Sequence, residues 1–150
     1  MSIHVLERQQ FVKQPLKEVF DFFSRAENLE KITPPWMRFR ILTPLPIPMQ
    51  AGTLIDYSIR IHGFPLNWRT LIESWAPPYQ FVDLQLQGPY TLWHHTHRFK
   101  EIDGGTAITD VVRYQLPLGP LGDLVHWLWV RHDVNQIFDY RSKRVPELLL

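Results

Sequence analysis

The sequence predicts one α+β domain with seven strands, two short helices near the N-terminus and one long C-terminal helix. Three observations support this. A chain of 150 residues fits one domain. Most of its middle alternates between apolar and polar residues with a period of two, as strands do. The segment Leu121–Leu149 instead has a helical period.

The N-terminal third predicts a strand followed by two helices. Ile3–Val12 alternates, although both of its faces carry apolar and polar residues, so its inward face is ambiguous. Pro15 is suited to the first turn of a helix, and its apolar stripe has helical spacing: Leu16, Val19, Phe20 and Phe23. Ser24 is expected to cap a second short helix that stops before Pro34.

Six further strands are expected to form an antiparallel sheet. Their predicted ranges are Arg38–Leu42, Thr53–His62, Leu66–Trp75, Tyr79–Gln87, a strand through Trp93–Phe99 and a strand from Ile108 to Leu116. Gly104 and Gly105 predict a two-residue hairpin turn between the last two. That turn would pair His97 with Val112 and would place Asp110 diagonal to His97.

The C-terminal helix carries two apolar stripes that point in different directions. One stripe runs from Val130 to Leu148, and Pro146 is expected to kink or fray its end. The segment Leu124–Val130 is apolar almost all round, and it contains Trp127 and Trp129. These tryptophans could form a cavity gate, a dimer face or a membrane contact, or they could pack on the Pro44–Pro48 loop.

Composition excludes several functional classes. The chain has no cysteine, so disulfides, thiolate catalysis and thiolate metal sites are excluded. The net charge is +1 and no basic stripe is present, so no nucleic-acid partner is expected. We find no signal-peptide pattern and no apolar run long enough to span a membrane. A cytoplasmic location is therefore expected.

Trp93, His95, His97 and Phe99 share one face of a strand, because alternate residues point the same way. Two imidazoles between aromatic residues suggest a pocket wall. Three alternatives are open: a polar patch satisfied by its surroundings, an acid–base set with Asp110, or a metal site of two histidines and a carboxylate. The polar patch is the simplest of these, so we expect no metal and no other cofactor.

The remaining charged residues have simpler interpretations. Four carboxylates are expected to be solvated: Glu7, Asp56, Glu73 and Asp83. Arg141 lies on the apolar stripe of the last helix, and we expect it to extend toward solvent or to pair with Asp21 or Glu18.

The order of these elements and several motifs resemble the helix-grip fold of the START and birch-pollen-allergen superfamily, also called SRPBCC. The matching motifs are Phe81-Val82-Asp83, Gly88-Pro89-Tyr90, Trp93–Phe99, Gly104-Gly105-Thr106 and Ile137–Arg141. The bacterial members grouped with polyketide cyclases and dehydrases are the most similar. The resemblance implies a sheet that curls around the last helix and leaves a cavity.

We therefore predict a protein that binds a hydrophobic small molecule, such as a lipid, an isoprenoid or a polyketide-like compound. The predicted ligand-binding residues are Tyr57, Ile59, Trp68, Thr70, Trp93, His95, His97, Phe99, Asp110, Val112, Tyr114 and Leu128. One alternative is a cyclase-, aromatase- or dehydratase-type enzyme that uses His95, His97 and Asp110 for acid–base catalysis. Another is an interaction module that forms a homodimer through the C-terminal helix.

Overall fold

A seven-stranded antiparallel sheet with strand order β1-β7-β6-β5-β4-β3-β2 forms the body of the protein. The computed structural model describes residues 2–149. Its strands are β1 (His4–Val12), β2 (Arg40–Ile41), β3 (Leu54–Ile61), β4 (Phe64–Ala76), β5 (Gln80–Gln87), β6 (Leu92–Ile102) and β7 (Gly105–Gln115). Its helices are α1 (Leu16–Phe23), α2 (Glu27–Lys31), the 3₁₀ turn Pro35–Met37, α3 (Gly119–Val125), the π-helical turn His126–Val130 and α4 (Arg131–Leu148).

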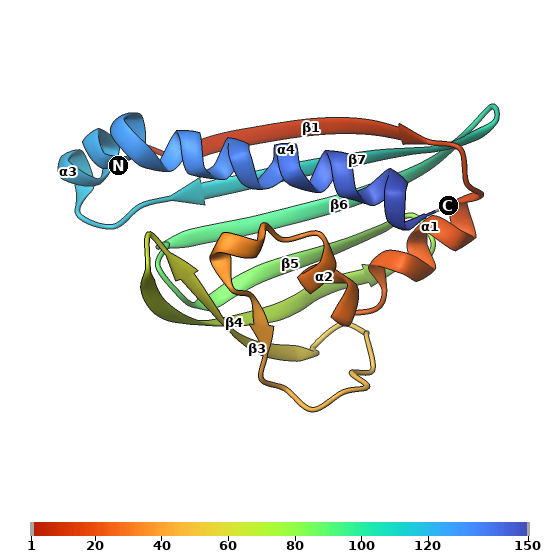
Figure 1. Ribbon diagram of the computed structural model, residues 1–150, viewed down its shortest axis with the longest axis horizontal. Helices are drawn as coiled ribbons and strands as arrows, with labels where there is room; N and C mark the ends of the chain where they lie inside the picture. The colour runs from red at the N-terminus through yellow and green to blue at the C-terminus, as the bar shows by residue number, and fades with distance from the viewer. Residues whose placement is uncertain (1, 150) are drawn as a thin grey trace.

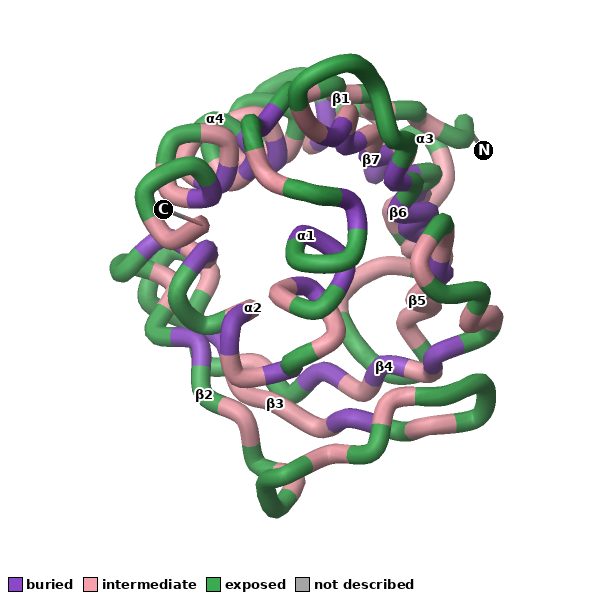
Figure 2. Tube along the Cα trace, turned by 90° about the vertical axis from the view of Figure 1, so that its right-hand side faces the viewer, coloured by how far each residue is buried: buried purple, intermediate pink, exposed green. Residues whose placement is uncertain are grey.

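The sheet is strongly curved, and helix α4 lies along its open side. Figure 1 shows α4 running the length of the sheet, with its C-terminal end beside α1. Seen end-on in Figure 2, the strands form an arc from β1 to β2, and α4 lies between the two ends of that arc. The concave face of the sheet therefore faces α4, α1 and α2.

Polar residues of β1 attach α4 to the edge of the sheet, which resolves the ambiguous face of this strand. Arg8 donates hydrogen bonds to Asp139 Oδ1 at 2.7 Å and to Asn135 Oδ1 at 2.8 Å. Gln10 donates to the backbone carbonyl of Ser142 at 2.6 Å. Pro146 has no N–H to bond the carbonyl four residues earlier, which is that of Ser142. Gln10 takes that place, and α4 continues to Leu148.

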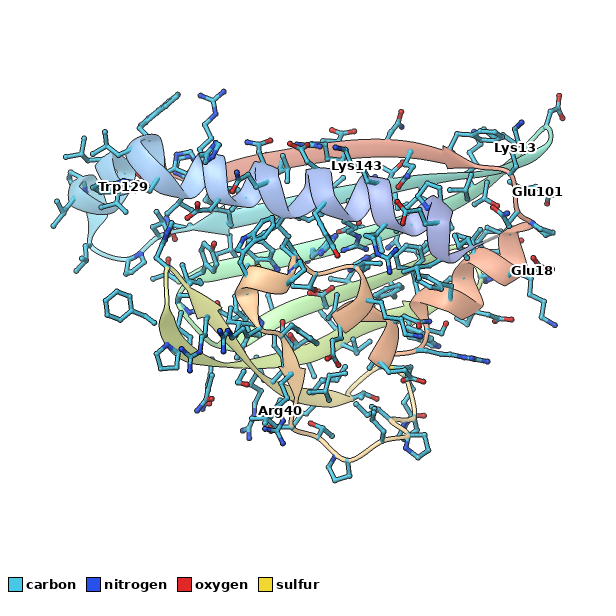
Figure 3. All side chains as sticks on the ribbon, in the orientation of Figure 1. Lys13, Glu18, Arg40, Glu101, Trp129 and Lys143 are labelled. Atoms are coloured by element: carbon cyan, nitrogen blue, oxygen red, sulfur yellow. The ribbon has the colours of Figure 1, made fainter. Side chains whose placement is uncertain are left out.

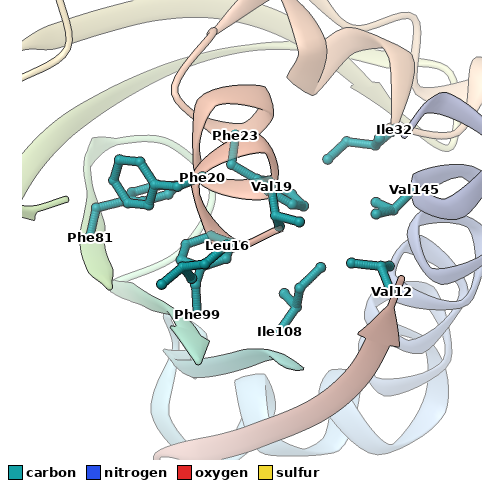
Figure 4. Packing of buried hydrophobic residues seen from close by; sticks show 10 residues of the cluster. All are labelled: Val12, Leu16, Val19, Phe20, Phe23, Ile32, Phe81, Phe99, Ile108 and Val145. Carbon is teal, nitrogen blue, oxygen red and sulfur yellow. The ribbon is translucent and has the colours of Figure 1, made fainter. Parts of the chain in front are cut away.

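Helix α1 closes one end of the curved sheet with an apolar core. All four residues of its predicted stripe are buried. They pack against residues from β1, β5, β6, β7 and α4, and Figure 4 shows the whole cluster: Val12, Leu16, Val19, Phe20, Phe23, Ile32, Phe81, Phe99, Ile108 and Val145. Burying an aliphatic or aromatic side chain of this size contributes roughly 1.5–3 kcal/mol. This cluster is therefore a main source of the stability of the fold.

Two local predictions in the N-terminal half are wrong. Ser24 does not cap α2; its hydroxyl donates to the carbonyl of Phe20 at 2.8 Å and so ends α1. The strand expected at Arg38–Leu42 is reduced to Arg40–Ile41, because Pro35 begins a 3₁₀ turn and Arg38 has a left-handed backbone with a φ of 46°.

The hairpin between β6 and β7 turns one residue earlier than predicted. Ile102 pairs with Gly105, so Asp103 and Gly104 form the turn, with Gly104 at a φ of 82°. Gly105 is instead the first residue of β7, where an added Cβ would lie 2.1 Å from the carbonyl oxygen of Val12. The register therefore shifts by two residues, which keeps the faces and places Asp110 directly opposite His97.

The segment before α4 extends beyond the sheet and exposes its apolar residues. Trp127 is 65% exposed and Trp129 is 55% exposed. Figure 3 places Trp129 at the end of the molecule where this segment lies, and Figure 1 shows the loop between β2 and β3 on the other side. The prediction that these tryptophans pack on the Pro44–Pro48 loop is therefore wrong. No helix within residues 2–149 is long and apolar enough to cross a membrane.

Candidate functional site

A cavity of about 880 Å³ lies between the concave face of the sheet and α4. Its size is within the range of small-molecule sites. Most of its wall is aromatic or aliphatic, and it includes Tyr57, Ile59, Trp68, Tyr90, Trp93, Ile137 and Phe138. The aromatic rings of the wall contact one another. Trp68 stacks on Tyr57 and meets Trp93 edge-on, with centroid distances of 5.9 and 5.5 Å. This wall suits an apolar ligand.

Seven of the predicted ligand-binding residues line this cavity. They are Tyr57, Ile59, Trp68, Thr70, Trp93, His95 and His97. Thr70 is satisfied within the wall, because its hydroxyl accepts from Trp68 Nε1 at 3.1 Å and lies 3.3 Å from the Tyr57 hydroxyl. Binding of a ligand by these residues stays a prediction.

Five predicted ligand-binding residues lie outside the cavity wall. Phe99 is buried in the α1 cluster. Val112 and Tyr114 pack with Val134 and Phe138. Asp110 lies behind the imidazoles. Leu128 is 56% exposed on the π-helical turn. The face pattern of a strand does not distinguish cavity lining from packed core. Ligand binding by these five residues also stays a prediction.

Three neighbouring strands bring four polar residues together on the concave face of the sheet, in two adjacent cross-strand pairs. In the register of the sheet, Asp83 of β5 is opposite His95 of β6, and Asp110 of β7 is opposite His97. His95 and His97 lie two residues apart on β6, so both point to the concave face. Their rings stack with centroids 3.6 Å apart.

Hydrogen bonds connect these four residues into one network. His97 Nε2 lies 2.5 Å from Asp83 Oδ2, and His95 Nε2 lies 2.8 Å from Asp110 Oδ1. Arg141 of α4 lies over these residues, with one guanidinium nitrogen 3.4 Å from His97 Nδ1 and 3.5 Å from Asp110 Oδ1. Because the guanidinium can only donate, His97 accepts at Nδ1 and donates from Nε2 to Asp83.

The charges of the network stabilise one another despite their burial. Burial alone would raise the pKa of the Asp83 carboxyl, but His95, His97 and Arg141 together hold it below its usual value. Burial also acts to raise the pKa of Asp110, and Arg141 and His95 outweigh it. The pKa of His97 is lowered to about 4, first by burial and then by His95. Both carboxylates are thus ionised, and His97 is neutral, at neutral pH.

Two members of the network were assigned other roles from the sequence. Asp83 was expected to be solvated, but its side chain is only 18% exposed and faces the cavity. Arg141 was expected to reach solvent or pair with Asp21 or Glu18, but it is buried beside Asp110. Pairing of β5 with β6 through the turn at Gly88 is the signal that could have found Asp83, because it brings Asp83 opposite His95.

One hydrogen-bonded pair joins the two sides of the cavity at the end near the β3–β4 hairpin. His62 Nε2 lies 2.7 Å from Asp133 Oδ2 of α4, and both residues line the cavity. His62 has a left-handed backbone with a φ of 50°, which turns its side chain out of the strand pattern. This pair is a direct polar contact between the β3–β4 hairpin and α4.

The curved sheet, the long helix and the cavity between them define a helix-grip protein. The family described as "Polyketide cyclase / dehydrase and lipid transport" matches residues 12–138, and the chain belongs to this family. The predicted membership in the helix-grip superfamily is confirmed. Among curated protein sequences, none matches this chain.

Solved structures share this fold at low sequence identity. The Zhui aromatase/cyclase from Streptomyces sp. R1128 is 14% identical with a TM-score of 0.79, over 99% of this chain and 94% of that chain. Ara h 8.0201 is 16% identical with a TM-score of 0.69, over 99% and 98% of the two chains. A nucleoside-diphosphate sugar epimerase from Corynebacterium glutamicum is 24% identical with a TM-score of 0.70, over 95% of this chain and 28% of that one. These likenesses confirm the predicted fold.

Replacement of Arg141 by Met should destabilise the protein by about 3–5 kcal/mol, because it leaves buried carboxylates without their compensating cation. The control is Arg144→Met, which breaks a surface pair with Glu147 on the same helix and should change stability by less than about 0.5 kcal/mol. Urea unfolding of both variants measures the difference. Equal stability of the two variants would contradict a buried ionic network at Arg141.

Proposed function

We propose that this protein binds a hydrophobic small molecule, such as a lipid, an isoprenoid or a polyketide-like compound, in the cavity between the sheet and α4. The observation that carries the proposal is the cavity of about 880 Å³ with its aromatic and aliphatic wall. An apolar ligand would exchange water contact for this wall, which is favourable at roughly 25 cal/mol per Å² of buried apolar surface. The family description and the fold support this class of ligand. The cytoplasmic location and the lack of a nucleic-acid partner stay predictions.

A side chain that fills the cavity should reduce ligand uptake. Ile59 lines the cavity on β3 and is 4% exposed. Ile59→Trp is expected to weaken binding of the apolar fluorophore N-phenyl-1-naphthylamine by roughly tenfold, equivalent to about 1.4 kcal/mol. Fluorescence titration measures this.

The matched control is Ser58→Trp, because the neighbouring residue of the same strand points to the opposite face. It should bind the fluorophore like the wild type. A wild-type protein that takes up no apolar probe, and that carries no small molecule in native mass spectrometry after gentle purification, would refute the proposed function.

A second candidate function is a cyclase-, aromatase- or dehydratase-type reaction on the bound ligand. The observation that favours it is the buried network, because His95 and His97 contact the cavity while Asp110 supports them from behind. Buried titratable groups with shifted pKa values in a cavity are typical of catalytic sites. In this candidate, Asp110 orients an imidazole, which moves a proton on a bound carbonyl compound.

His95→Gln and His97→Gln should each lower kcat by roughly 100-fold or more on a poly-β-ketone substrate, because each variant loses a proton-transferring group. His94→Gln is the control, since His94 lies on the same strand and its side chain pairs with Glu73 on the opposite face. Turnover measured by product chromatography distinguishes them. Unchanged turnover in both site variants excludes this candidate.

In the proposed homodimer, the exposed apolar segment before α4 would form the interface. Trp129→Ser should shift a concentration-dependent dimer toward monomer in sedimentation velocity, because it removes exposed apolar area from the interface. Tyr79→Ser, which changes an equally exposed aromatic residue in the β4–β5 turn, should not. A wild type that is monomeric at all concentrations removes the dimer proposal.

A further inference from the structure

Two imidazoles and one carboxylate converge on the cavity floor with the atoms that metal ions use. Asp83 Oδ2 lies 2.5 Å from His97 Nε2 and 3.7 Å from His95 Nδ1. One ligand atom from each residue lies within 4.8 Å of the other two. Two histidines and a carboxylate are a common ligand set for zinc and for non-haem iron. We propose that Asp83, His95 and His97 form a binding site for a divalent transition-metal ion such as Zn²⁺ or Fe²⁺.

The second nitrogen of each imidazole already faces a supporting carboxylate. His95 Nε2 lies 2.8 Å from Asp110 Oδ1, and His97 Nδ1 lies 3.5 Å from the same oxygen. Histidines that bind metals almost always donate their other N–H to a carboxylate, a carbonyl or water, which fixes the ring and its tautomer. Asp110 therefore supports both rings, and this leaves His95 Nδ1 and His97 Nε2 on the side of Asp83.

The charge of the site favours a cation. Asp83 and Asp110 carry two negative charges, and Arg141, 3.5 Å from Asp110, supplies one positive charge. Metal coordination requires neutral imidazoles, and with both imidazoles neutral one negative charge of the site is uncompensated. A dication coordinated by Asp83 would supply that charge in a region where burial makes uncompensated charge costly.

The position of the site leaves coordination positions open to the cavity. All three proposed ligands line the cavity, and their side chains are between 5% and 18% exposed. Metal sites that act on ligands keep such open positions, whereas structural sites are closed by four protein ligands. An ion here would meet the polar end of a molecule held by the apolar wall.

Metal binding requires a small rearrangement of the hydrogen bonds that His97 makes. Metal–ligand bonds of about 2.0–2.2 Å place neighbouring donor atoms roughly 3 Å apart. The hydrogen bond between Asp83 and His97 must therefore open, and His97 Nδ1 must change from accepting from Arg141 to donating to Asp110. The ion would occupy the same nitrogens that proton transfer needs, so metal binding and acid–base catalysis by these imidazoles exclude each other.

The test uses the full chain without an affinity tag, stripped with a chelator and titrated with Zn²⁺ alone in a calorimeter. We expect one ion per chain with a dissociation constant of about 1 μM or lower, equivalent to roughly −8 kcal/mol. Asp110→Asn should weaken binding about 10- to 100-fold as a supporting residue. His95→Gln and His97→Gln should weaken it more, as direct ligands. His94→Gln, on the opposite face of β6, should bind like the wild type.

The spectrum of bound Co²⁺ reports coordination directly. Visible absorption bands of Co²⁺ should appear in the wild type and in His94→Gln, and they should be lost in Asp83→Asn. If a glutamine variant fails to fold by circular dichroism, imidazole NMR of the wild type decides: Zn²⁺ must shift two buried histidines and spare His94.

Two results would overturn the proposal. One is a wild type that binds no Zn²⁺ at protein concentrations of about 50 μM, well above the expected dissociation constant. The other is a His95→Gln/His97→Gln double variant that binds Zn²⁺ like the wild type, which would place the ion at another group such as His62 and Asp133. Because the metal is tested alone, failure of the hydrophobic-ligand proposal does not affect either result.

Discussion

The buried contact between Arg141 and Asp110 is the constraint on which the centre of the molecule depends. It joins α4 to β7 across the concave face, where apolar packing alone would favour a filled core. A charged residue in such a place is stable only when paired and hydrogen-bonded. Asp110 is therefore tied to Arg141 and His95 together, and His97 is tied to Asp83 and Arg141. The helix cannot move independently of three strands without breaking this network.

The ends and the middle of the fold solve different physical problems. At one end, α1 packs an apolar cluster against β5, β6 and β7, and three of its ten residues, Phe23, Ile32 and Phe81, also line the cavity. In the middle, the curvature of the sheet keeps α4 too far from β3 and β4 for side chains to fill the space, and a cavity results. Most residues of the cluster lie away from the cavity, so the fold is anchored mainly by side chains that a ligand would not contact.

The polar network and the apolar wall together suggest how one molecule would be oriented. An apolar body would lie against Tyr57, Trp68 and Trp93, and its polar end would face Asp83 and the two imidazoles. The network can meet that end with hydrogen bonds, with a proton or with a bound metal ion. Membership in the polyketide cyclase, dehydrase and lipid transport family fits both a carrier and an enzyme. The two differ in whether Asp83 and the imidazoles only hold the polar end of the ligand or also react with it.

The sequence by itself determined the class of fold, because the element order and the period-two and helical patterns are local properties. It also placed His95, His97 and most of the aromatic wall on the correct face, since alternation along a strand needs no partner. Only the tertiary structure decided which carboxylate meets which imidazole. Asp83 lies on one face of β5, and the other face carries Val82, Leu84 and Leu86. The local pattern therefore predicts that the face with Asp83 is the solvated one. Its burial follows from the pairing of β5 with β6 and from the approach of α4 with Arg141, which are contacts between residues far apart in the chain.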